Sequence, residues 1–223
     1  MMTEEKSPAT PRPETPKWVR KILFPALAGG VVGYGAAAAA LHLIGLEPVG
    51  GLGKSPTIAT LVGVLYIVIG LAVGLGTLSP RVGARFLNVE DADELRELKK
   101  VLTSSGSAMV LWGVGLIGLA LAAPDGPVPQ AAALALGAGG LVIGTLLAIP
   151  SYRLSDELMR AVNLEAGAIS YGLMLLFAGG WAMLAHLRYV AAPAPLDLLT
   201  LFYVVVLLAS FIATGRRGML TPR

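Results

Sequence analysis

The sequence predicts an all-α polytopic membrane protein with six transmembrane helices, and three observations lead to this fold class. The 223 residues are 55% hydrophobic and 14% charged, with a mean hydropathy of +0.73, which is outside the range of ordinary soluble domains. Six apolar runs each reach about 20 residues, enough for an α-helix to cross the bilayer core. Basic residues are concentrated in alternate connecting segments. The predicted spans are 22–46, 57–78, 104–123, 130–150, 164–187 and 195–214.

The charge distribution orients these spans. With six spans, both termini lie on one face, and that face holds 15 of the 17 Lys and Arg residues. The other face keeps only Lys54 and Arg188. Short loops rich in Lys and Arg stay in the cytoplasm, so both termini are expected to be cytoplasmic. Residues 1–21 are polar and contain four prolines, which predicts a disordered cytoplasmic tail, and 215–223 form a short C-terminal tail.

Pairs of glycines four residues apart occur in three of the predicted spans. Small residues at this spacing let helix backbones approach closely, and close packing associates helices in lipid. Chance is the alternative explanation, because glycine is common in membrane spans. The pairs are Gly29 and Gly33 in the first span, Gly70 and Gly74 in the second, and Gly140 and Gly144 in the fourth.

Two interior loops resemble each other and predict a parallel two-span repeat. Each has a proline, then basic residues, then Asp-Glu-Leu before the next span; the acidic pairs are Asp93 with Glu94, and Asp156 with Glu157. Spans two and three would then correspond to spans four and five, although the spacing differs between the loops.

Each Asp-Glu-Leu is expected to open a helix that continues into the bilayer. No proline interrupts 91–122 or 156–185, and acidic residues in a first turn favour the positive end of the helix dipole. Asn88 and Ser155 are the predicted N-caps. These acidic residues, with Arg160 on the second helix, form a candidate contact surface for a partner on the cytoplasmic face.

Glu165 is the acidic residue closest to the predicted hydrocarbon region, at the cytoplasmic end of span five. An ionisable residue inside a span often marks a functional site, whereas one at the interface is commonly paired or hydrated. Both interpretations stay open for Glu165. Asn163, Ser170 and Tyr171 lie nearby in the sequence and could form a cavity with it.

His42 and His186 are the two histidines, and each lies about 20 residues into an outward-running span. Two histidines at similar depth suggest haem or metal ligation, but no further ligand lies at helical spacing to complete a site. The chain has no cysteine, and it contains no HExxH or GxSxG motif. We therefore expect no catalytic residue, no cofactor and no metal. The small net charge of +3 lies beside the spans, so we expect no nucleic-acid partner.

The segment 156–172 reads DELMRAVNLEAGAISYG. It resembles a short motif of small, uncharacterised bacterial multispanning inner-membrane proteins, in which an Asp-Glu pair precedes Glu-Ala at the start of a span. The resemblance implies a multi-pass protein of the cell inner membrane with unassigned activity, and it implies no catalytic roles. The first loop departs from the pattern, because Ser104 and Ser105 stand in place of Glu-Ala.

These observations favour a non-enzymatic accessory or interaction subunit, whose partners are the lipid bilayer and either another membrane protein or a second copy of the chain. The spans lack charged groups at their centres and are rich in small residues suited to helix packing. A small-solute or ion permease or channel that uses Glu165 is the alternative. A haem- or metal-binding membrane protein that uses His42 and His186 is the third hypothesis.

Overall fold

The computed structural model describes residues 35, 53–77, 92–123 and 126–219, and the described part of the chain is all-helical. Five helices are long and apolar enough to cross a membrane, consistent with a multi-pass membrane protein. They are Lys54–Gly76, Leu98–Ala120, Gln130–Leu154, Glu157–His186 and Pro195–Arg216. These helices confirm spans two to six. The first predicted span lies outside the described residues, so the count of six and the placement of the termini stay predictions.

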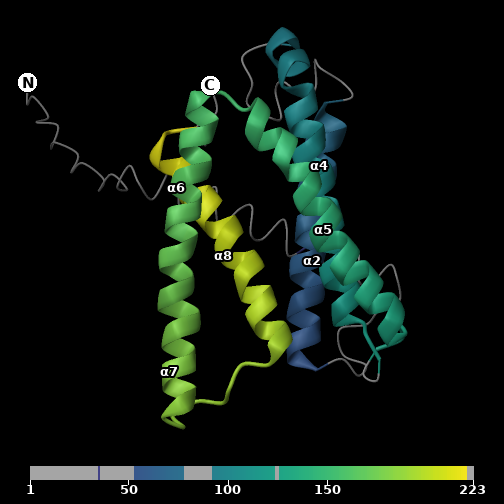
Figure 1. Ribbon diagram of the computed structural model, residues 1–223, viewed down its shortest axis with the longest axis vertical. Helices are drawn as coiled ribbons and strands as arrows, with labels where there is room; N and C mark the ends of the chain where they lie inside the picture. Colours follow the sequence, from purple (N-terminus) through teal and green to yellow (C-terminus); the bar gives the residue numbers. More distant parts are fainter. Residues whose placement is uncertain (1–34, 36–52, 78–91, 124–125, 220–223) are drawn as a thin grey trace, which may run out of the picture.

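The helices that the structure describes form an open row (Figure 1). Extended contacts connect α5 to α4, α4 to α2, α2 to α8, and α8 to α6. The elements are α2 (Lys54–Gly76), α4 (Ala92–Ala120), α5 (Gln130–Leu154), α6 (Glu157–Met174), the π-helix η2 (Leu175–Gly179), α7 (Gly180–His186) and α8 (Pro195–Arg216). In Figure 1, α6 and α7 form one long helix along one side of the molecule, and α8 lies obliquely between it and the other helices.

Two pairs of glycines bring the backbones of α2 and α4 into contact. A Cβ added to Gly113 would lie 2.5 Å from the carbonyl oxygen of Gly63, and a Cβ added to Gly106 would lie 2.7 Å from that of Gly70. No larger residue fits at such distances. The glycines on each helix are seven residues apart, so they share one face. Of the predicted pair in this span, Gly70 lies at the contact, whereas a Cβ on Gly74 would meet open space.

The contact between α4 and α5 also depends on glycine. A Cβ on Gly140 would lie 2.5 Å from the carbonyl oxygen of Leu111, and one on Gly144 would lie 2.6 Å from the indole ring of Trp112. The structure therefore places both glycines of the predicted pair in span four against α4. Gly29 and Gly33 lie outside the described residues.

Two tyrosines join α8 to the helices α2 and α4. The Tyr66 hydroxyl donates to the carbonyl oxygen of Tyr203 at 2.8 Å, and the Tyr203 hydroxyl donates to that of Trp112 at 3.3 Å. The two rings meet edge to face with their centroids 5.0 Å apart. Leu116 is fully buried in the same cluster. The core of the described helices therefore lies where α2, α4 and α8 meet.

α5 continues beyond the predicted end of span four. The helix passes through Pro150 and ends at Leu154, so residues expected in a loop are helical. Proline has no N–H and weakens the hydrogen bonds of the preceding turn, which usually ends a helix. In a membrane, a hydroxyl group from a neighbouring helix can satisfy the freed carbonyl groups. Ser104 of α4 donates to the carbonyl oxygen of Leu147 in that turn.

Both Asp-Glu-Leu segments lie at helix starts, as predicted, because α4 begins at Ala92 and α6 at Glu157. The N-cap of α6, however, is Asp156 rather than the predicted Ser155. The Asp156 carboxylate accepts the Met159 N–H at 2.7 Å, and a charged acceptor complements the helix dipole better than a hydroxyl does. The Ser155 hydroxyl instead donates to the Ser151 carbonyl at the end of α5. The other predicted N-cap, Asn88, lies outside the described residues.

The expected two-span repeat is not reflected in helix packing. α2 and α4 pack extensively against each other, but α5 and α6 share no extended contact within the described residues, although they are adjacent in the chain. The two proposed units therefore have different internal packing, and the repeat stays a prediction from the sequence.

Helices α7 and α8 end in similar turns with different residues. After α7, Arg188 has a left-handed φ of 63°, and the Tyr189 N–H donates to the Leu184 carbonyl at 3.0 Å. After α8, Gly218 takes the same role with a φ of 74°. Glycine adopts this conformation without steric cost, whereas arginine does not.

Candidate functional site

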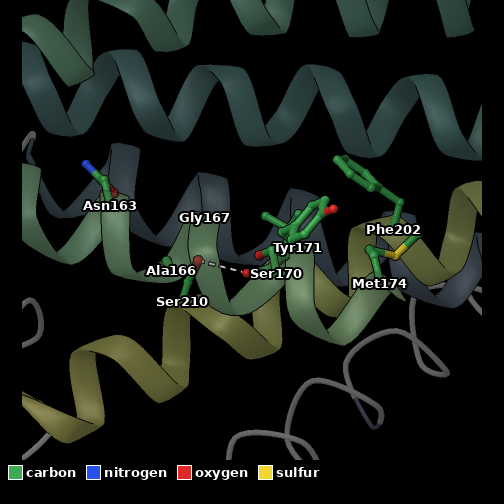
Figure 2. Close-up of a pocket in the computed structure, with 9 residues that line it drawn as sticks. Asn163, Ala166, Gly167, Ser170, Tyr171, Met174, Phe202 and Ser210 are labelled. Carbon is green, nitrogen blue, oxygen red and sulfur yellow. Dashed lines mark hydrogen bonds between the residues drawn. The ribbon is translucent and has the colours of Figure 1, made fainter. Parts of the chain in front are cut away.

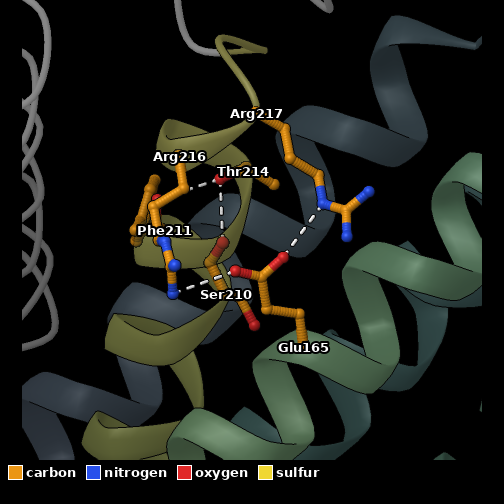
Figure 3. Close-up of polar contacts among 6 residues, drawn as sticks. All are labelled: Glu165, Ser210, Phe211, Thr214, Arg216 and Arg217. Carbon is orange, nitrogen blue, oxygen red and sulfur yellow. Dashed lines mark hydrogen bonds and ion pairs between the residues drawn. The ribbon is translucent and has the colours of Figure 1, made fainter.

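Glu165 forms ion pairs with two arginines that follow one another at the end of α8, as Figure 3 shows. Its Oε1 lies 3.1 Å from Nη1 of Arg216, and its Oε2 lies 3.0 Å from Nε of Arg217. Both carboxylate oxygens are therefore paired. The contact ties α6 to the C-terminal end of α8, across 52 residues of sequence.

The cluster is partly accessible to solvent. The exposed fraction of the side chain is 23% for Glu165, 33% for Arg217 and 64% for Arg216. Two positive charges face one negative charge, so the cluster has a net positive charge. The pairing of Glu165 agrees with the second interpretation, in which the carboxylate is paired at the interface.

A groove with a volume of about 530 Å³ lies between α6 and α8, and Figure 2 shows the residues that line it. Asn163, Ser170 and Tyr171 contribute to its lining, as does Ser210 of α8. Glu165 does not line the groove. Of the four residues expected to form a cavity, three therefore do so, and the carboxylate is not among them.

The groove has a polar end and an apolar end. Asn163 lies at the end that the predicted topology places at the cytoplasm, and Met174 and Phe202 lie toward the opposite end. The Ser210 hydroxyl already donates to the Val206 carbonyl of its own helix at 2.8 Å. The lining has no charged residue and is largely apolar, which suits an apolar molecule better than an ion.

The other predicted contact residues have structural partners or are not described. Asp156 caps α6, and exposed Glu157 lies in its first turn. Arg160 donates to the carbonyl oxygen of Arg153 at 2.8 Å, which connects α6 to the end of α5. Asp93 and Glu94 lie in the first turn of α4, where the structure does not describe side chains.

The structure describes only one of the two histidines. His186 is the last residue of α7 and is exposed, whereas His42 lies outside the described residues. Within the described residues, no group of three or more His, Asp or Glu side chains is placed to hold a metal ion.

Sequence reasoning did not identify Arg216 and Arg217 as partners of Glu165, nor Phe202 and Ser210 as groove residues. A usable signal existed for the arginines, because the predicted topology places the base of span five and the end of span six on the same face. The groove residues of α8 carry no comparable signal, since Phe and Ser are ordinary residues of a span.

Comparisons of the chain with models of protein families, with curated proteins and with solved structures found no match in any of the three.

Proposed function

We propose that this chain is a non-enzymatic membrane protein that acts by binding another membrane protein, as an accessory or interaction subunit. The binding surface is the edge helix, defined as the continuous helix Glu157–His186 that comprises α6, η2 and α7. The partner is a transmembrane helix of a second protein.

The burial of the edge helix is the observation that carries this proposal. None of its most apolar stretch is buried, whereas the buried share of the corresponding stretch is 33% in α2 and 39% in α4. Leu164 and Leu175 are 64% and 66% exposed. Within the described residues, α8 is the one other helix with which α6 has extended contact. A helix at the end of an open row offers a long face to a neighbour in the bilayer. α5 lies at the other end of the row, but 22% of its most apolar stretch is buried, against none in the edge helix.

The permease alternative has less support. Both oxygens of Glu165 are paired with arginines, and the groove that would be a candidate path lacks this carboxylate. The described helices form a row, while a path for solutes needs helices on several sides. Replacing Glu165 with Gln in reconstituted vesicles tests the alternative directly, since loss of an established flux would favour it.

Site-specific photo-crosslinking in native membranes tests the proposed function. A photoreactive amino acid at Leu164 or Leu175 should produce a discrete adduct with a second protein, identified by mass spectrometry. Val142 of α5 is the matched control, because its side chain is 59% exposed on another helix. Fully buried Leu116 controls for adducts within the chain. Lipid adducts alone at both edge positions, or equal protein adducts from Val142, would contradict the proposal.

A further inference from the structure

The groove between α6 and α8 has an apolar end and a polar end, which match the acyl chains and the headgroup region of a phospholipid. Its apolar end, at Met174 and Phe202, lies within the membrane-spanning part of both helices. Its polar end, at Asn163, lies near the predicted cytoplasmic interface. An acyl chain favours the first environment, and a glycerol backbone with its ester groups favours the second. The volume of about 530 Å³ is within the range of small-molecule sites in proteins.

Positive charge follows the polar end of the groove along α8. Arg217 comes seven residues after Ser210, which lines the groove, so the two positions share one face of the helix and are about 10 Å apart along its axis. The Glu165 cluster has two arginines for one carboxylate, and Arg216 keeps most of its side chain exposed. Arginine recognises phosphate with strong, charge-assisted hydrogen bonds. The cluster is therefore complementary to an anionic headgroup and not to a neutral one.

We propose that the groove binds one anionic phospholipid of the cytoplasmic leaflet, with an acyl chain between α6 and α8 and its phosphate against Arg216 and Arg217. The site is independent of the proposed protein partner, because the groove lies on the side of α6 next to α8. Glu165 opposes the headgroup by neutralising part of the arginine charge. The lipid thus fills a space that the two helices leave open.

Native mass spectrometry of the full chain in mild detergent tests the groove, with phosphatidylglycerol and phosphatidylcholine of identical acyl chains as probes. Gly167 lines the groove, and a Cβ at this position would meet nothing within 4 Å, so Gly167→Leu fills the groove without a clash at Cβ. Gly172→Leu is the matched control, since Gly172 is equally open but does not line the groove. We expect Gly167→Leu to lose most bound phosphatidylglycerol and Gly172→Leu to keep it. Equal binding by both variants would overturn the proposal.

The arginine cluster is tested by two variants with opposite expected effects. Replacing both Arg216 and Arg217 with Gln should abolish the preference for phosphatidylglycerol over phosphatidylcholine. Glu165→Gln should raise the affinity for phosphatidylglycerol about fivefold, because it removes the competing negative charge near the membrane surface. A purely structural role of Glu165 predicts a lower affinity of this variant for phosphatidylglycerol, because loss of the ion pairs would loosen the groove. No preference between the two lipids in the unmodified protein, or weaker binding by Glu165→Gln, would overturn the headgroup assignment.

Discussion

The helices of the α2–α4–α5 group and those of the α6–α8 pair pack in different ways. In the α2–α4–α5 group, backbones touch at glycines, for example where Gly63 meets Gly113. In the α6–α8 pair, a small cluster around Ala166 and Ala213 and the two ion pairs of Glu165 provide the contact. Direct backbone packing leaves no space between helices, whereas side-chain contacts at one end leave a groove. The first group is therefore the more closely packed, and the second is the part of the molecule that has a groove.

The largest expected effect comes from breaking the glycine-packed group. Gly113→Leu places a side chain against the backbone of α2, and no rotamer relieves a clash at Cβ itself. We expect destabilisation of about 3 kcal/mol or more, measured as a lower melting temperature in mild detergent. Gly139→Leu on α5 is the control, because a Cβ there meets nothing within 4 Å. Similar melting temperatures for the two variants would contradict the proposed difference between the groups.

The second largest loss of stability is expected at the contact between α2 and α8. Tyr66→Phe removes the hydrogen bond from α2 to α8 and leaves the Tyr203 carbonyl without this donor. Because Tyr66 is only 3% exposed, we expect a loss of about 1 to 2 kcal/mol in a denaturation experiment. Tyr171→Phe should have almost no effect, since Tyr171 is 74% exposed. A fall in stability no larger than that of the Tyr171→Phe control would show that this hydrogen bond contributes little.

A smaller effect is expected within the α6–α8 pair. Glu165→Gln removes both ion pairs, and partly exposed pairs contribute about 0.5 to 1 kcal/mol. The difference in melting temperature from the unmodified protein should shrink at high salt, because ions screen exposed charges. Exchanging the charges, with Glu165→Arg and Arg217→Glu together, should restore part of the salt dependence. A loss that is independent of salt would indicate packing rather than electrostatics.

The smallest effect is expected at the C-terminal end of the edge helix. Arg188→Gly relieves the left-handed backbone conformation but gives the unfolded chain more freedom. We expect a net gain of about 0.5 kcal/mol, seen as a slightly higher melting temperature. The reciprocal change Gly218→Arg, at the end of α8, should lower it. A change of the melting temperature in the same direction and of the same size in both variants would contradict this explanation.

The helices were predictable from sequence because lipid imposes a simple rule, namely about 20 apolar residues for each span. Predicted boundaries differed where a neighbour compensates for a local defect. Pro150 should end a helix when judged alone, but a hydroxyl from Ser104 lies in the preceding turn and α5 continues. The choice of Asp156 over Ser155 as N-cap depended on a local competition between two good capping residues.

The candidate site was predictable in part. The position of Glu165 at the start of a span and the neighbouring polar residues of α6 could be read from periodicity and charge. For its partners Arg216 and Arg217, the predicted topology gave the face of the membrane but not the pairing, because they are contributed by a helix far along the chain. The glycine contacts were predictable only in part, because Gly63 with Gly70 and Gly106 with Gly113 are seven residues apart and not four.

The π-helix η2 determines which face α7 presents on the side of the α6 stripe. A π-turn contains one more residue than an α-turn, so every side chain beyond it is rotated by about 100° relative to an uninterrupted helix. In an uninterrupted helix, the stripe of Val162, Ala166 and Ile169 that packs with the end of α8 would continue at positions 177, 180 and 184. From η2 onward the half-buried side chains each come one position later, at Ala178, Trp181 and Ala185. The extra residue therefore keeps these side chains in line with the stripe, and deleting one residue of η2 would rotate them away from it.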